Sequence, residues 1–102
     1  MAIRSSTSPD GKTLTIQIEG RFDASTLEEF RRCYELEGGR APEKYNVDLS
    51  EAVYLDSSAL GMLLVLRDFA GGETSQITIS NCSDQVKKIF SISSFEQLFT
   101  IQ

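Results

Sequence analysis

The topology of this chain follows from residues 45–72, which read YNVDLSEAVYLDSSALGMLLVLRDFAGG. Over residues 45–49 apolar and polar side chains alternate, which is the period of a half-buried strand. From Ser57 to Ala70 apolar residues cover most of a helix circumference, and Gly71-Gly72 can supply the left-handed residue that ends many helices. Residues 50–55 show no clear period and are expected to form an irregular link. The stretch therefore predicts a strand, a link and a helix that is largely buried or shares its surface with a partner.

The residues before this stretch predict a hairpin and a helix. Thr13 to Glu19 alternates apolar and polar residues like a strand, and the turn signal Ser8-Pro9-Asp10-Gly11 makes Ala2 to Thr7 its hairpin partner. Ser25 and Glu28 then have the spacing of a capping box, so a helix is expected to start there. Its apolar residues are Leu27, Phe30 and Tyr34, and Gly38-Gly39 is expected to close it.

The residues after it continue the same alternation. Gln76 to Ser80 reads as a strand, Ser83 as the cap of a helix that buries Val86, Ile89 and Phe90, and Leu98 to Ile101 as a short last strand. The resulting order is β-β-α-β-α-β-α-β. We therefore predict an α/β fold with a single mixed sheet of about four to five strands and three main helices.

Composition limits both the architecture and the partners. The chain has 102 residues, 40% of them apolar, which suits one domain over residues 1–102. Its net charge of −5 disfavours nucleic acid and anionic membranes as partners, and a monomer is the default expectation. The start has no signal-peptide pattern and no apolar run is long enough to span a bilayer, so we expect a cytoplasmic protein with reduced Cys33 and Cys82.

A candidate site lies where the strand at residues 45–49 leads into the Ser57 helix. Asp56, Ser57 and Ser58 are expected at the carboxyl rim of the sheet, and Asp23 should reach the same rim after the preceding strand. The positive end of a helix tolerates an added phosphate, which would join the two aspartates in a dense negative cluster. Pattern alone favours simple helix capping by this segment, and one serine hydroxyl could cap while the other stays exposed.

Catalysis is disfavoured by the residue types present. The chain contains no histidine, no Gly-x-Ser-x-Gly elbow and no lysine three residues after Ser57, so no familiar base can activate that hydroxyl. No phosphate-binding glycine loop occurs either. Asp23, Asp48 and Asp56 lack the spacing of a metal loop. We therefore predict that the protein is not an enzyme and that it has no cofactor and no metal.

Three segments together resemble one family. Residues 48–64, with Leu55-Asp56-Ser57-Ser58-Ala59-Leu60-Gly61 at their centre, resemble the signature of STAS domains of the anti-sigma factor antagonist type. Gly20-Arg21-Phe22-Asp23 is similar to the family's segment after the second strand, and residues 79–99 resemble its last helix and strand. The resemblance covers nearly the whole chain. Ala59 stands where many members have glycine, which leaves the serine hydroxyls intact.

The resemblance implies partner switching. The phosphorylated residue would be Ser57, with Ser58 as the second candidate. Unphosphorylated protein would bind an anti-sigma factor with serine kinase activity of the GHKL type and release it on phosphorylation, a PP2C-type phosphatase would reset it, and further effector proteins could share the surface. The residues expected to contact the partner are Asp23, Asp56, Ser57, Ser58, Ala59, Leu60 and Met62.

The family also implies an alternative. Other STAS domains are constitutive interaction subunits of transporters or lipid-transport complexes. In such a protein Ser57 would merely cap the helix, and the apolar face of the helix from Ser57 to Ala70 would dock permanently.

Overall fold

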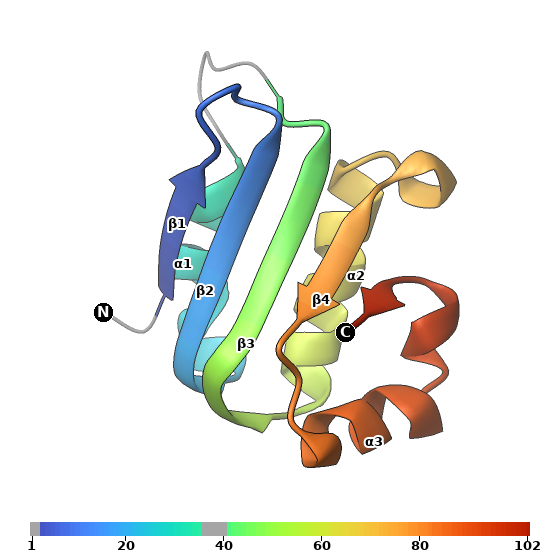
Figure 1. The fold of residues 1–102 in the computed structure, drawn as a ribbon. Coiled ribbons are helices and arrows are strands. Elements are labelled where there is room, and N and C mark those ends of the chain that lie inside the picture. Colours follow the sequence, from blue (N-terminus) through green and yellow to red (C-terminus); the bar gives the residue numbers. More distant parts are fainter. Residues whose placement is uncertain (1–2, 36–40) are drawn as a thin grey trace.

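The computed structural model describes residues 3–35 and 41–102 and contains a five-stranded sheet in the order β1-β2-β3-β4-β5. β1 runs antiparallel to β2, and the remaining neighbours are parallel, so the sheet is mixed as predicted (Figure 1). The strands are β1 (Ile3–Thr7), β2 (Thr13–Phe22), β3 (Lys44–Leu55), β4 (Ile77–Ser80) and β5 (Thr100–Ile101).

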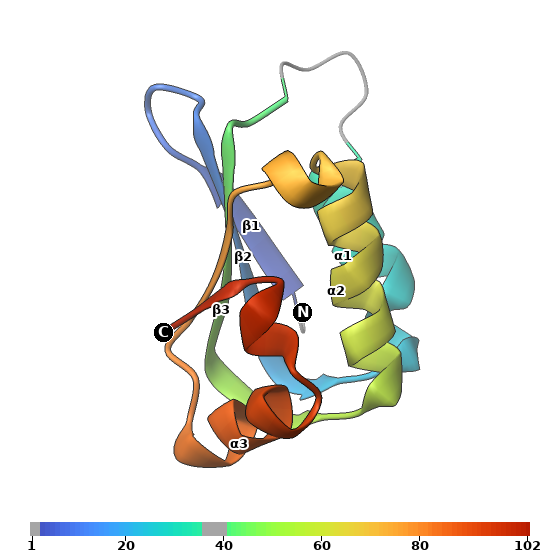
Figure 2. The ribbon, with the colours of Figure 1, turned by 90° about the vertical axis from the view of Figure 1, so that its right-hand side faces the viewer.

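In the described part of the chain, three α-helices connect the strands. They are α1 (Leu27–Tyr34), α2 (Ser57–Phe69) and α3 (Asp84–Ile92), with short 3-10 turns at η1 (Ala24–Thr26), η2 (Gly72–Thr74) and η3 (Phe95–Gln97). Figures 1 and 2 show α1 and α2 side by side on one face of the sheet, with α3 beside the carboxyl end of β3. Among the residues that the structure describes, none forms a helix on the opposite face of the sheet (Figure 2). The element order and the α/β class are those predicted from sequence.

The core lies between the sheet and the helices on its covered face. Alternate residues of the central strands are fully buried, and so are the inward residues of α1 and α2. The aromatic rings of Phe22 and Phe30 lie 5.2 Å apart, centre to centre, which joins the end of β2 to α1. Burial of these apolar side chains is the main term that stabilises the sheet–helix packing, and it fixes the position of α2 against β3.

The predicted irregular link at residues 50–55 is wrong, because β3 continues to Leu55. The pairing between β2 and β3 shifts register between Gln17 and Glu19 and again between Gly20 and Arg21. Such irregularities break the alternation of buried and exposed side chains without ending the strand. Gly20 has a φ of +79°, a conformation that glycine adopts without steric cost. β2 accordingly extends to Phe22, beyond its predicted end.

The predicted capping box at Ser25 and Glu28 is also wrong. The chain first makes the 3-10 turn η1, capped by Asp23, and α1 begins only at Leu27. Leu27 is 39% exposed, whereas Phe30 and Tyr34 are buried as predicted. The helix end predicted at Gly38-Gly39 lies outside the described residues.

Other local predictions are confirmed. The turn at residues 8–11 closes with a 2.8 Å hydrogen bond from Gly11 N–H to the Ser8 carbonyl. Gly71, with a φ of +119°, follows the last turn of α2, and the Ser83 hydroxyl caps α3 by accepting from Val86 N–H at 3.2 Å. The last strand, by contrast, begins only at Thr100, because the backbone N–H groups of Leu98 and Phe99 both donate to the Phe95 carbonyl and so continue the turn of η3. Across residues 3–35 and 41–102, no helix combines the length and the apolar character that crossing a bilayer requires.

Candidate functional site

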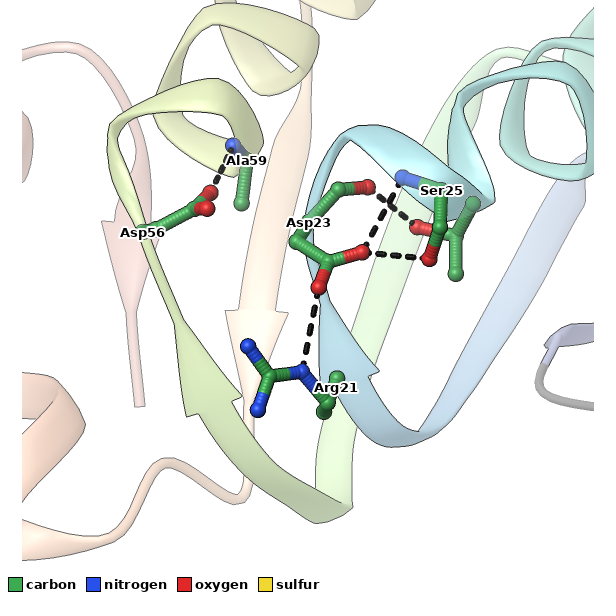
Figure 3. Close-up of polar contacts among 6 residues, drawn as sticks. Arg21, Asp23, Ser25, Asp56 and Ala59 are labelled. Atoms are coloured by element: carbon green, nitrogen blue, oxygen red, sulfur yellow. Dashed lines mark hydrogen bonds and ion pairs between the residues drawn. The ribbon is translucent and has the colours of Figure 1, made fainter.

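Two neighbouring strand ends form the rim on which the candidate site lies. Phe22 of β2 pairs with Leu55 of β3 in a parallel register, so the next residues, Asp23 and Asp56, leave the sheet side by side. Figure 3 shows both carboxylates at this edge, each beside the start of the helical segment that follows it. The structure thus brings Asp23 to the rim of the Ser57 helix, as the predicted topology requires.

Asp56 is the N-cap of α2. Its backbone is extended, with φ of −123° and ψ of −173°, and its Oδ1 accepts a 3.1 Å hydrogen bond from the Ala59 N–H. Ser57 and Ser58 are therefore the first two residues of the helix, and both side chains are exposed. The option that one of these serines is the cap is wrong. An aspartate fills that role, which leaves both hydroxyls outside the cap.

Asp23 is held by a denser set of contacts than Asp56. Its Oδ1 accepts from the Ser25 backbone N–H at 3.0 Å and from the Ser25 hydroxyl at 2.5 Å, and its Oδ2 lies 3.1 Å from Arg21 Nε (Figure 3). The Ser25 hydroxyl, and after it the Arg21 guanidinium, lower the pKa of Asp23 below its ordinary value. This carboxylate is consequently ionised and fixed in place beside the start of α2.

Arg21 and Tyr54 are rim residues that the sequence reasoning missed. The guanidinium carbon of Arg21 lies 4.4 Å from the centre of the Tyr54 ring, a cation–π geometry, while its Nε pairs with Asp23. The two residues are paired across β2 and β3. Tyr54 fell in the segment predicted to be irregular, and an aromatic residue there was the only sequence signal that could have found it.

The remaining residues of the expected partner surface differ in exposure. Leu60 is half-buried, whereas Ala59 and Met62 are 0% and 5% exposed and belong to the core beneath α2. A partner cannot contact Ala59 and Met62 without opening the core. We therefore restrict the candidate surface to Asp23, Asp56, Ser57, Ser58 and Leu60, together with Arg21 and Tyr54.

The described residues give little support for metal binding or for cysteine chemistry. Within residues 3–35 and 41–102, no three His, Cys, Asp or Glu side chains gather as metal ligands would. Cys33 and Cys82 are free and half-buried, and burial raises the pKa of both thiols. A raised pKa lowers the fraction of thiolate, which is the form of cysteine that reacts as a nucleophile.

The fold and the rim define a small α/β domain that exposes a serine at the start of a helix. The family model described as "Mlab, STAS domain" matches residues 5–100, and the chain belongs to the STAS domain family. A STAS-domain containing protein of Pseudomonas aeruginosa is 58% identical over 101 residues, which is 99% of each chain.

Solved structures share this fold at low identity. The anti-sigma factor antagonist SpoIIAA in its unphosphorylated form has a TM-score of 0.75 and 17% identity over 99% of this chain and 87% of its own. Phosphorylated SpoIIAA from Bacillus has a TM-score of 0.65 and 19% identity over 99% and 91%. A sulfate transporter family protein from Wolinella succinogenes has a TM-score of 0.71 and 12% identity over 91% and 84%. The fold is thus shared by an anti-sigma factor antagonist and by a sulfate transporter family protein.

Proposed function

We propose that this protein is an anti-sigma factor antagonist that works by partner switching. In its unphosphorylated form it binds an anti-sigma factor that is also a serine kinase of the GHKL type. Phosphorylation of Ser57 by that kinase releases the antagonist, and a PP2C-type phosphatase restores it. The proposal treats residues 1–102 as one cytoplasmic STAS domain that binds proteins and catalyses no reaction itself.

The observation that carries the proposal is the position of Ser57. It is exposed at the first position of α2, and because Asp56 makes the cap, a phosphate on its hydroxyl removes no capping hydrogen bond. The free N–H groups of the first turn and the positive end of the helix macrodipole favour the added anion. Modification of Ser57 is therefore compatible with an unchanged fold.

Phosphorylation of Ser57 changes the charge of the surface that the partner would contact. A phosphoserine adds about −1.5 to −2 charges near neutral pH, and here it would join Asp56 in sequence and Asp23 across the strand ends. A partner surface matched to a neutral hydroxyl would then face three anionic groups. Like charges brought together at an interface cost several kcal/mol, and about 1.4 kcal/mol already changes affinity tenfold.

The comparisons support this reading at the level of the fold. SpoIIAA is known in unphosphorylated and phosphorylated forms, and both share the fold of this chain. A switch that leaves the backbone in place is consistent with that observation. The likeness is one of fold, so the partner and the phosphorylation site of this chain rest on its own residues.

Binding measurements on three variants test the proposal. Ser57→Ala should keep its affinity for the cognate kinase, and Ser57→Asp should lose at least about tenfold, because it places a fixed negative charge on the rim. Ser6→Asp, at an exposed serine on β1, makes the same chemical change away from the rim and should have no effect. Equal affinity of Ser57→Ala and Ser57→Asp would reject the switch.

A constitutive subunit of a transporter or lipid-transport complex is the second candidate function. It is favoured by the apolar side chains that α2 leaves exposed, namely Leu64 at 41%, Val65 at 55% and Phe69 at 52%. If these residues make a permanent interface, Val65→Glu should abolish partner binding and Ser57→Asp should leave it unchanged. The opposite pattern is expected for the antagonist.

A further inference from the structure

Gly61 occupies an unfavourable position in α2. It lies inside a 13-residue helix, four residues after the first residue, Ser57. Glycine is the least favourable residue for a helix interior after proline, because it loses the most backbone freedom on folding. Alanine at the same position would stabilise the helix. The helix by itself therefore gives no reason for a glycine here.

Packing within the chain does not require this glycine either. The other described glycines have positive φ values, which residues with a side chain rarely adopt: Gly11, Gly20, Gly71 and Gly72. Gly61 has no such φ. Beyond the adjacent helix backbone, a Cβ built on Gly61 would meet no atom within 4 Å in the described part of the chain. No contact inside the structure thus offsets the cost of glycine at this position.

Gly61 lies one helical turn from Ser57, on the same face of α2. Residues four apart on an α-helix are neighbours, with about 5–6 Å between their Cβ atoms. Both residues are exposed. Because the Cα–Cβ bond in a helix tilts toward the N-terminus, a side chain at position 61 would extend toward Ser57. A partner that contacts the Ser57 hydroxyl closely enough to respond to one phosphate therefore also lies over Gly61.

We infer that Gly61 sets how closely the partner that Ser57 controls can approach α2. The inference rests on the proposed partner switching and adds one residue to the contact surface. Apolar atoms of the kinase pack against the bare helix backbone at Gly61, in the space that a side chain would fill. That contact brings the kinase down onto the first turn of α2, where the Ser57 hydroxyl is exposed.

Substitution of Gly61 should move stability and affinity in opposite directions. Gly61→Ala should raise the melting temperature by roughly 4–8 °C, because alanine favours the helix. The same variant should weaken binding of the cognate kinase at least about fivefold, because the added methyl group overpacks the contact. Gly61→Leu adds more volume and should weaken binding further while staying at least as stable as the parent. Thermal unfolding and calorimetric titration of the full chain with the purified kinase measure both effects.

Asp68→Ala is the matched control on the same helix. Asp68 is exposed and lies seven residues beyond Gly61, which is about 10 Å along the helix axis. Alanine is a better helix former than aspartate, so this variant should also gain stability but should leave kinase binding unchanged.

Three results would overturn the inference. A lower melting temperature for Gly61→Ala would mean that the glycine is required inside the chain. Unchanged kinase affinity of Gly61→Ala would mean that no partner atom occupies the space above it. An equal loss of affinity in Gly61→Ala and Asp68→Ala would mean that stiffening the helix, and not the added methyl group, weakens binding.

The outcome is separable from that of the proposed function when Ser57→Asp is measured with the same kinase. If Ser57→Asp weakens kinase binding and Gly61→Ala does not, the switch stands and only the role of Gly61 is refuted. If Gly61→Ala weakens kinase binding and Ser57→Asp does not, the kinase contact at Gly61 stands and the switch is refuted.

Discussion

Replacing Asp56 by alanine tests whether Asp56, and not Ser57, caps α2 and so leaves the Ser57 hydroxyl free for modification. The structure assigns one capping hydrogen bond to this side chain, from Ala59 N–H to Oδ1 at 3.1 Å. Loss of an N-cap costs about 1 kcal/mol. For a domain of this size that loss lowers the melting temperature by roughly 4–8 °C. Asp56→Asn should recover most of the loss, because asparagine caps nearly as well and only the charge at the helix start is removed.

Urea unfolding followed by circular dichroism measures the effect, with Ser57→Ala and Ser58→Ala as matched controls. Neither serine makes the cap, so each control should stay within about 0.5 kcal/mol of the parent. A stable Asp56→Ala together with a destabilised Ser57→Ala would refute the reasoning. It would mean that Ser57 caps the helix and that a phosphate there disturbs the fold.

Two further predictions concern the core and the acidic rim. Leu63 is fully buried on α2, so Leu63→Ala should cost about 2–5 kcal/mol in urea unfolding, whereas Leu64→Ala, at a 41% exposed position, should change stability much less. Folding lowers the pKa of Asp23 from its ordinary 3.8, so its carboxylate stabilises the fold above that value and the stabilisation is lost as the pH falls through the lower folded-state pKa. Asp23→Asn should therefore be less stable than the parent at neutral pH, and the difference should shrink in titrations below pH 3.8.

The sequence predicted the elements wherever one periodicity persisted. The alternation at residues 13–19 and 45–49 and the apolar helix after Ser57 located β2, β3 and α2, and the parallel crossover then placed Asp23 and Asp56 on one rim. That placement needs only topology, because consecutive parallel strands end at the same edge. The candidate site could be located for the same reason.

The details that escaped prediction depend on contacts between strands. The register shifts near Gly20 interrupt the alternation of buried and exposed residues in β3. Because that alternation is what identifies a strand in a sequence, the second half of β3 was not predicted. The choice of cap at both helix starts was decided by backbone geometry: Asp23 and Asp56 are extended residues at strand ends, and each accepts from an N–H that follows it. The Arg21–Tyr54 contact exists because β2 and β3 pair these two residues.

Incubation with ATP and the cognate kinase, followed by mass spectrometry and a binding measurement on the same sample, tests the central claim most directly. We predict one phosphate on Ser57, absent from Ser57→Ala, and loss of kinase binding in the modified sample. Modification of Ser58 alone would move the site by one residue. No modification of either serine, or a phosphorylated protein that binds the kinase as tightly as before, would contradict the account.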